Sequence, residues 1–386
     1  MSRISSLSFG ALALLAGVAC TSQNDSSASG NSDATIQVSS TDDACELSAT
    51  SAPSGNVVFE VTNDGGQVTE FYVYAEDGVR VVGEVENIGP GISRNLVVQV
   101  APGEYLTACK PGMSGDGIRA AFTVTDSGVD PLAAADIVEL AATASDRYHD
   151  YVHQQATELL EATEDFAALV VGGDDEAARA LYPQARTYWE RIEPVAEAFG
   201  DLDPRLDLRE ADLEPGQEWT GWHVFEKDLW PPTEGYSALT AEQRSALADL
   251  LVADTAELLE RVDGSTYDPT VLGNGAKELL DEVATGKVTG EEEIWSHTDL
   301  WDFQANIDGA RVAFEVLQPM LDRKDPELVE TLTDRFAAVQ ASLDTHRDGA
   351  GFVFYDELTE AEVRQLVDAV DALAEPLSNL TAAVVL

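Results

Sequence analysis

The hydrophobic pattern of this chain changes its period near residue 127, and this change constrains the fold more than any other feature. Between about Thr35 and Thr125, short runs of β-branched and aromatic residues are separated by turn signals such as Pro102-Gly103. From about Pro131 onward, apolar residues recur instead at spacings of three and four, which is typical of amphipathic helices. We therefore expect a β domain followed by an α domain, and 386 residues suffice for each to bury its own core.

The first region, residues 35–127, predicts a small Greek-key β-sandwich, because its strand candidates are short and regularly spaced. The clearest candidates are residues 56–61, 69–74, 95–100 and 121–124. The second region, residues 131–386, predicts a helical bundle. Its long helices should be divided at the breakers Gly172-Gly173, Pro231-Pro232 and Gly273-Asn274-Gly275.

The N-terminus indicates export. An apolar run from Leu7 to Ala19 is too short to span a bilayer and is typical of the core of a signal peptide. It ends in small residues before Cys20, which is similar to a bacterial lipobox, although Gly17 stands where leucine is usual. We expect residues 1–20 to be a lipoprotein signal with Cys20 lipidated; a non-lipidated secretory signal is the alternative. Residues 21–34 are polar and Ser-rich and predict a flexible tether.

The charge of the chain limits its partners. It has 71 acidic and 22 basic residues, a net charge of −49. This balance argues against nucleic acid as a partner, since phosphate binding depends on Lys and Arg patches. An acidic surface attracts cations, but it also keeps an exported protein soluble or reflects a salty habitat.

Two cysteines fall in the β region. With Cys20 assigned to lipid, Cys45 and Cys109 remain, and an exported pair usually forms a disulfide. The alternative is a soft-metal site that adds Met113 or a carboxylate, because the run from Cys109 to Met113 is similar to the metal-binding corner of cupredoxins. A blue-copper centre needs two histidines. The β region has none.

The helical region contains a histidine and a glutamate at helical spacing. His223 stands three residues before Glu226, so both side chains share a helix face and could bind one cation. A second pair, Glu190 and Glu193, stands one turn apart just before Pro194, which removes a backbone donor and should distort the helix beside it.

An acidic segment separates these two pairs, and Asp207 is the residue within it that we expect to supply another oxygen ligand. Each residue alone is weak evidence, since carboxylate pairs are common in so acidic a chain. Together they predict an oxygen-rich site for a hard or borderline metal.

Three longer segments resemble the EfeO-type family of bacterial iron-uptake components, which joins a cupredoxin-like domain to an imelysin (peptidase M75) domain. They are residues 109–113, residues 188–197 with 220–227, and residues 289–309. The family motif Gly-x-His-x-x-Glu falls on Gly221, His223 and Glu226. The resemblance implies further carboxylate ligands at Glu190, Glu193 and Asp207.

The resemblance also implies a role. The chain would capture Fe(II) or Fe(III), with copper or zinc as further cargoes, on the outer face of the bacterial cytoplasmic membrane. It would deliver the metal to an iron permease and act beside a secreted haem-peroxidase-like partner. Carboxylate ligands fit this role, since oxygen donors suit Fe(III) and release Fe(II) readily.

The alternative function is a zinc metallopeptidase, as the M75 name suggests. A zincin carries its general-base glutamate between two histidines in His-Glu-x-x-His. Here Lys227 takes the place of the second histidine. Only a distant ligand such as His297 could complete such a site. Because aromatic residues surround His297 in the sequence, we expect it instead to be packed against them, with its ring hydrogen-bonded to a carboxylate that supports the site. We therefore expect a metal carrier, not an enzyme.

Overall fold

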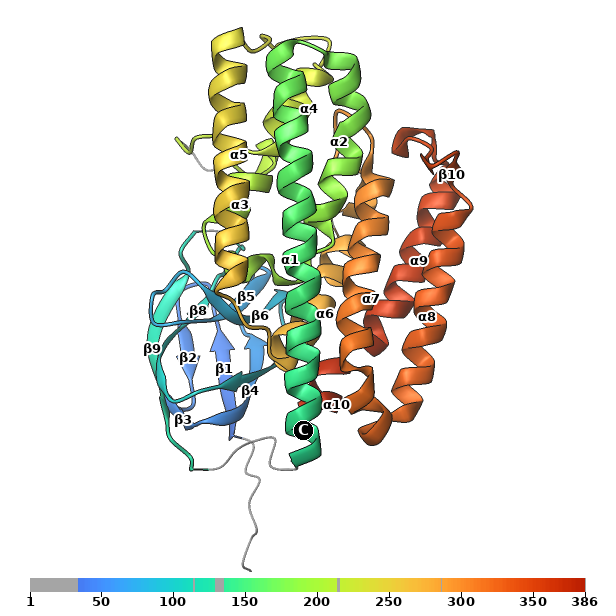
Figure 1. Cartoon of the computed structure of the whole chain (residues 1–386). Coiled ribbons are helices and arrows are strands. Elements are labelled where there is room, and N and C mark those ends of the chain that lie inside the picture. Colours follow the sequence, from blue (N-terminus) through green and yellow to red (C-terminus); the bar gives the residue numbers. More distant parts are fainter. Residues whose placement is uncertain (1–33, 114, 129–134, 214–215, 286, 386) are drawn as a thin grey trace, which may run out of the picture. The chain divides into compact units, whose positions relative to one another are not determined.

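The computed structural model describes residues 34–113, 115–128, 135–213, 216–285 and 287–385. A β-sandwich precedes a set of long helices, as the change of period predicts (Figure 1). Residues 33–386 form one compact unit. Cys20 and the expected signal and tether lie outside the described residues. Among the helices that are described, none combines the length and apolar character needed to cross a bilayer.

The sandwich consists of two sheets. The first has the strand order β2-β1-β4-β7 and the second β3-β9-β8-β5-β6. The strands are β1 (Ala34–Ser40), β2 (Cys45–Leu47), β3 (Ser51–Pro53), β4 (Gly55–Asn63), β5 (Thr69–Tyr74), β6 (Val81–Ile88), β7 (Ser93–Val100), β8 (Gly103–Cys109) and β9 (Ile118–Thr125). All four expected strands are present within these bounds, and β1 and β4 pair in parallel.

The sandwich has an apolar core between its sheets. Phe59 of β4 and Phe122 of β9 face each other there, with ring centroids 5.4 Å apart. A disulfide joins Cys45 of β2 to Cys109 of β8 and so links the two sheets. Neither cysteine therefore offers a thiolate to a soft metal. Met113, four residues after Cys109, is 42% exposed.

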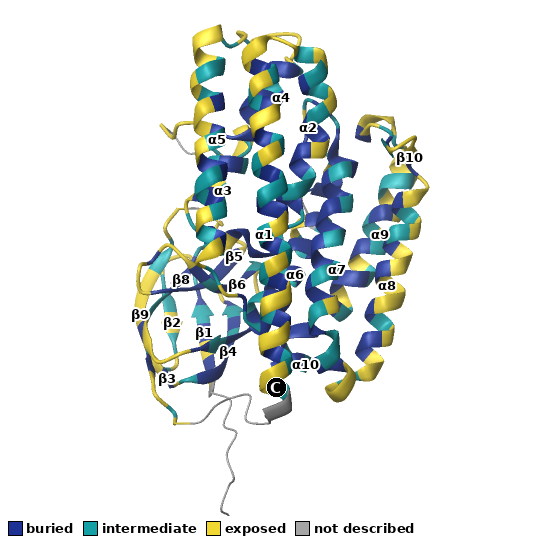
Figure 2. Cartoon of the chain, in the orientation of Figure 1, coloured by how far each residue is buried: buried dark blue, intermediate teal, exposed yellow. Residues whose placement is uncertain are grey.

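Helices form the rest of the unit. They are α1 (Ala135–Gly172), α2 (Asp175–Glu190), η1 (Glu193–Phe199), α3 (Leu202–Asp207), η2 (Glu210–Asp212), α4 (Trp222–Leu229), α5 (Ala241–Asp263), α6 (Pro269–Thr285), η3 (Lys287–Thr289), α7 (Asp299–Lys324), α8 (Pro326–Asp344), η4 (Tyr355–Glu357), α9 (Glu360–Leu377) and α10 (Leu380–Val385). A short hairpin, β10 (Arg347–Asp348) and β11 (Gly351–Phe352), follows α8. The helices bury their apolar faces against one another and expose their outer faces (Figure 2).

Pro194 ends a helix, as expected. The α-helix α2 stops at Glu190, and the chain continues as the 3₁₀ segment η1, with a non-helical residue at Val195. Glycines on two neighbouring helices contact this break. Gly275 of α6 and Gly309 of α7 lie so close to the main chain of residues 191–194 that an added Cβ would overlap a carbonyl oxygen there.

The expected breakers have mixed outcomes. Gly172 ends α1, and Pro231-Pro232 follow the end of α4. The expectation of a break at Gly273-Asn274-Gly275 was wrong, because these residues lie inside α6. The packing explains why: Gly273 contacts Thr381 of α10 and Gly275 contacts Pro194, so the missing side chains permit close approach and do not mark a turn.

The sandwich and the helices meet at β6, β7 and α6. Asn274 of α6 donates to the carbonyl of Val97 in β7 at 2.8 Å and accepts a hydrogen bond from Thr381 at 2.7 Å. Asn56 of β4 donates to the carbonyl of Val385 at 2.8 Å. These contacts attach the sandwich to the helices that carry the site described below.

The glycine at position 275 gives a test of this packing. Gly275→Ala should lower the free energy of unfolding by about 1–3 kcal/mol, because the new methyl group overlaps the Pro194 carbonyl. Gly172→Ala is the matched control, since nothing lies within 4 Å of an added Cβ there, and it should change stability by less than about 1 kcal/mol. Urea unfolding of both variants makes the comparison; equal stabilities would contradict the proposed close packing.

Candidate metal site

His223 lies at the start of the short helix α4, two residues after the cap Gly221. Gly221 has a φ of 89°, and a Cβ there would overlap the carbonyl of Leu206. The glycine of the Gly-x-His-x-x-Glu motif therefore has a physical role. It lets the end of α3 approach the start of α4, and this approach brings Asp207 close to His223.

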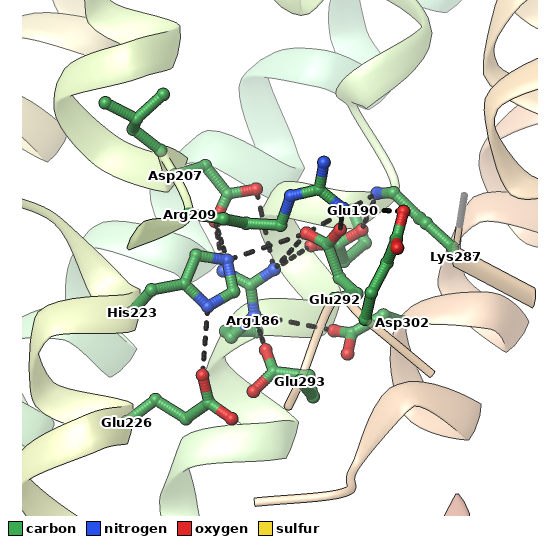
Figure 3. A network of polar contacts seen from close by, with 12 residues as sticks. Arg186, Glu190, Asp207, Arg209, His223, Glu226, Lys287, Glu292, Glu293 and Asp302 are labelled. Atoms are coloured by element: carbon green, nitrogen blue, oxygen red, sulfur yellow. Dashed lines mark hydrogen bonds and ion pairs between the residues drawn. The ribbon is translucent and has the colours of Figure 1, made fainter. Parts of the chain in front are cut away.

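The imidazole of His223 is almost fully buried between three carboxylates (Figure 3). Its Nδ1 lies 3.2 Å from Oε2 of Glu226. Its Nε2 lies 3.5 Å from Oδ1 of Asp207 and 3.5 Å from Oε1 of Glu292. No hydrogen bond within the described residues reaches this Nε2. Two groups of ligand atoms lie within 4.8 Å of one another, Asp207–His223–Glu292 and His223–Glu226–Glu293.

Glu226 is held in place from two sides. Its Oε1 accepts the backbone N–H groups of Trp295 and Ser296, at 2.9 and 2.8 Å, while Oε2 faces His223. A metal-binding histidine commonly directs its second ring nitrogen to a carboxylate in this way, which fixes the orientation of the ring. The geometry therefore suits Glu226 to orienting His223, with Nε2 as the ligand atom.

Glu292 and Glu293 are site residues that the sequence reasoning missed. They come from the segment before α7, within the run Glu291-Glu292-Glu293, and both are buried. Three consecutive acids in a chain with 71 acidic residues look like a solvated run. The available signal was their place in a segment, residues 289–309, that resembles the EfeO-type family.

Arg186 of α2 lies at the centre of the network and is fully buried (Figure 3). It forms an ion pair with Asp207, and its Nη2 and Nε lie 2.5 Å from Glu190 and Glu293 respectively. Asp207 also accepts a hydrogen bond from Trp189 Nε1 at 2.8 Å. Arg186 therefore shares Asp207 with His223 and supplies part of the positive charge that the buried carboxylates require.

Glu190 and Glu193 lie at the other end of this network. Lys287 Nζ is 2.9 Å from Glu190 and 2.6 Å from Glu193, and Asn306 Nδ2 donates to both carboxylates. The predicted proximity of the two glutamates is present, but neither belongs to the groups around His223. Their oxygens face the amine, the guanidinium of Arg186 and the amide instead.

Burial and neighbouring charges raise the pKa values of some groups in the network and lower those of others. Burial and the Arg186 charge lower the pKa of His223, but its contacts with Glu226 and Glu292 and the Asp207 charge outweigh them and raise it to about 9. Burial raises the pKa of Glu226, yet the His223 contact and two backbone donors bring it below its usual value. Burial and the Glu226 charge raise the pKa of Glu293 well above its usual value.

The imidazole of His297 lies away from the site, although its backbone N–H donates to the carbonyl of Glu293 at 2.7 Å. Its imidazole is 41% exposed and lies 4.0 Å from Asp356, so the expectation of a packed histidine supporting the site needs correction. The main chain explains its position. His297 has a φ of 58°, and its carbonyl accepts the N–H of Tyr355 at 2.8 Å, which directs the residue to the C-terminal segment.

Comparison with known proteins identifies both regions. The family model of imelysin, Peptidase M75, matches residues 144–380, and that of the cupredoxin-like domain matches residues 10–124. The iron uptake system component EfeO of Yersinia pseudotuberculosis is 36% identical over 348 residues, which cover 89% of this chain and 90% of that protein. EfeO of Escherichia coli O157:H7 is 35% identical over the same shares of both chains.

The similarity extends over the sandwich, the helices and the segments that carry the His223 network. The chain therefore belongs to the EfeO family of iron uptake system components, in which a cupredoxin-like domain precedes an imelysin domain.

Proposed function

We propose that this protein is an exported iron carrier that binds its cargo between Asp207, His223 and Glu292. The observation that carries the proposal is the buried Nε2 of His223, which lacks a hydrogen bond from the described residues and faces two carboxylate oxygens at 3.5 Å. A cation at this point would satisfy all three groups. Glu226 would hold the ring from the opposite nitrogen.

The donor set supports iron as the cargo. One imidazole with several carboxylates suits a hard or borderline cation, and oxygen donors favour Fe(III) while holding Fe(II) less tightly. Zinc and copper also accept imidazole and carboxylate ligands. The relatives named as iron uptake components favour iron among these.

Arg186 supports reversible binding. Its guanidinium pairs with Asp207, one of the proposed ligands. A metal ion at His223 would draw Asp207 away from this pair, while Arg186 keeps Glu190 and Glu293 as partners. Uptake and release would then exchange one positive charge for another, without leaving a bare carboxylate in a buried site.

We further propose that Cys20 carries a lipid and that the protein acts at the outer face of the cytoplasmic membrane. There it would pass iron to a membrane permease and work beside a haem-peroxidase-like partner. The support is the sequence pattern of residues 7–20 and the sequence similarity to named components of an iron uptake system.

The peptidase alternative has less geometric support. Both ligand groups among the described residues rely on the same histidine, His223. Glu226, the residue in the position of a catalytic base, has its oxygens turned to backbone N–H groups and to His223. A general base must instead reach a water or substrate proton.

Substitution at the network tests the ligand set. His223→Ala should weaken Fe(II) binding by at least about 100-fold, and Glu226→Ala by about 10- to 100-fold through loss of ring orientation. Glu292→Gln should weaken binding more than Glu190→Gln, because Glu190 faces Arg186 and Lys287. Anaerobic calorimetric titration measures all four, with the exposed His297→Ala as control. Wild-type affinity in His223→Ala and Glu292→Gln would refute the proposed site.

The raised pKa of His223 predicts a pH dependence. Below pH 9 the metal-free imidazole is mostly protonated, so a metal at Nε2 must displace a proton. Fe(II) affinity should therefore rise by about tenfold per pH unit between pH 6 and 8 and level off above 9. Glu226 and Glu292, whose pKa values are lowered, stay ionised throughout. Titration in buffers of different ionisation enthalpy measures the proton release. His223→Gln should abolish it; a flat profile in the wild type would contradict the assignment.

A protease assay separates the two functions. The purified mature chain with added Zn²⁺ should leave unfolded casein and peptide libraries intact, since Glu226 directs its oxygens to backbone N–H groups and to His223. Cleavage that depends on Zn²⁺ and disappears in Glu226→Gln would overturn the carrier proposal in favour of the peptidase.

A further inference from the structure

Each of the two carboxylates that face Nε2 of His223 presents only one oxygen to it. Asp207 directs Oδ1 and Glu292 directs Oε1 to this nitrogen, both at 3.5 Å. The other oxygen of Asp207, Oδ2, accepts a hydrogen bond from Trp189 Nε1 at 2.8 Å. The other oxygen of Glu292, Oε2, lies 3.6 Å from Nη1 of Arg209 (Figure 3). Groups of the protein itself therefore hold the second oxygen of each carboxylate.

Arg209 is fixed where it reaches Glu292. Its Nε lies 2.7 Å from Oδ2 of Asp212, and its Nη1 lies 3.4 Å from Oε1 of Glu291. Burial opposes the charge of Arg209, but the charges of Glu292, Asp212 and Glu291 outweigh it and raise the pKa of the guanidinium above its usual value. The side chain therefore stays charged, and only another cation can take its place beside these carboxylates.

The cavity next to the site is strongly acidic. It has a volume of about 520 Å³ and reaches both Asp207 and Glu292. The described residues that line it include nine glutamates and three aspartates, and Arg209 is the only lysine or arginine among them. So many carboxylates raise the local concentration of cations of every kind. Selection among those cations must therefore come from the site itself.

Calcium and the borderline metals differ in the ligands that they need. Ca²⁺ takes about six to eight oxygen ligands, often with both oxygens of a carboxylate. At this site it would need Oε2 of Glu292 and the carboxylate of Glu291, so Arg209 would have to leave both. Fe(II) accepts an imidazole ligand. It can use Nε2 of His223 with the two oxygens that face it, while Arg209 keeps its partners.

We propose that Arg209 determines the metal specificity of the His223 site by withholding carboxylate oxygens from Ca²⁺. The inference rests on the proposed function, because it takes the His223 network as the metal site. Specificity is a difference between two affinities, and it can be obtained by an arrangement that opposes the wrong partner. Here Ca²⁺ must separate Arg209 from Glu292 and Glu291, whereas Fe(II) leaves this ion pair intact.

Competition between the two ions tests the proposal in the mature full-length chain. Anaerobic calorimetry measures the Fe(II) binding event that is lost in His223→Ala, with and without added Ca²⁺. In Arg209→Gln the ratio of Ca²⁺ affinity to Fe(II) affinity should rise at least about tenfold, because Glu292 gains a free second oxygen. Both ions carry two positive charges, so the loss of one positive charge from the protein affects both affinities and cancels in the ratio.

Two further variants separate charge from geometry. Arg335→Gln removes the same charge from an exposed position of α8 and should leave the ratio unchanged. Arg209→Lys keeps the charge but lacks the planar fork that reaches Asp212, Glu291 and Glu292 together, so the ratio should rise by about threefold. Circular dichroism checks that each variant is folded.

An unchanged ratio in Arg209→Gln, or an equal rise in Arg335→Gln, would overturn the role of Arg209. A wild type with a His223-dependent Fe(II) event and an unchanged ratio in Arg209→Gln would leave the proposed function standing. A wild type without any His223-dependent Fe(II) event would instead refute the proposed function, and the specificity inference with it.

Discussion

The buried guanidinium of Arg186 is the interaction on which the site depends. A fully buried charge is tolerated only when it is paired and hydrogen-bonded. Removing one partner of such a pair destabilises the protein by more than the intact pair stabilises it. Arg186 meets this requirement through Glu190 on its own helix, Asp207 at the end of α3, and Glu293 before α7. Segments more than 100 residues apart must therefore converge, and their convergence is what places Asp207 beside His223.

Much of the fold could be predicted from local pattern. The alternating strands and the change to helical spacing were readable, since each depends on neighbours within a few residues. The strand β6 was missed because Glu84 and Glu86 interrupt its apolar character, and only the covering helices explain buried glutamates on a strand. Gly275 was misread as a breaker because its role depends on Pro194, which is distant in the sequence and close in space.

The site was predictable in part. His223 and Glu226 are one helical turn apart, so their proximity followed from spacing, and Asp207, predicted as a further oxygen ligand, lies 3.5 Å from His223. The assignment of Glu190 and Glu193 as ligands stays a prediction, and it was made without knowledge of Lys287, which lies almost 100 residues further on and pairs with both carboxylates. Pairings between distant residues are set by tertiary packing, which periodicity does not report.

The joint between sandwich and helices combines hydrogen bonds of neutral groups with an ion pair between Arg94 of β7 and Asp281 of α6. Asn274, Thr381 and Asn56 connect the two regions through amide, hydroxyl and carbonyl dipoles. Hydrogen bonds of this kind neither titrate near neutral pH nor weaken much as counterions accumulate, whereas exposed charge pairs are screened. In a chain of net charge −49, changes of ionic strength or acidity will act on the carboxylates and their cations. The neutral hydrogen bonds at the joint are little affected by the same changes, whereas the Arg94–Asp281 pair beside them is weakened by salt.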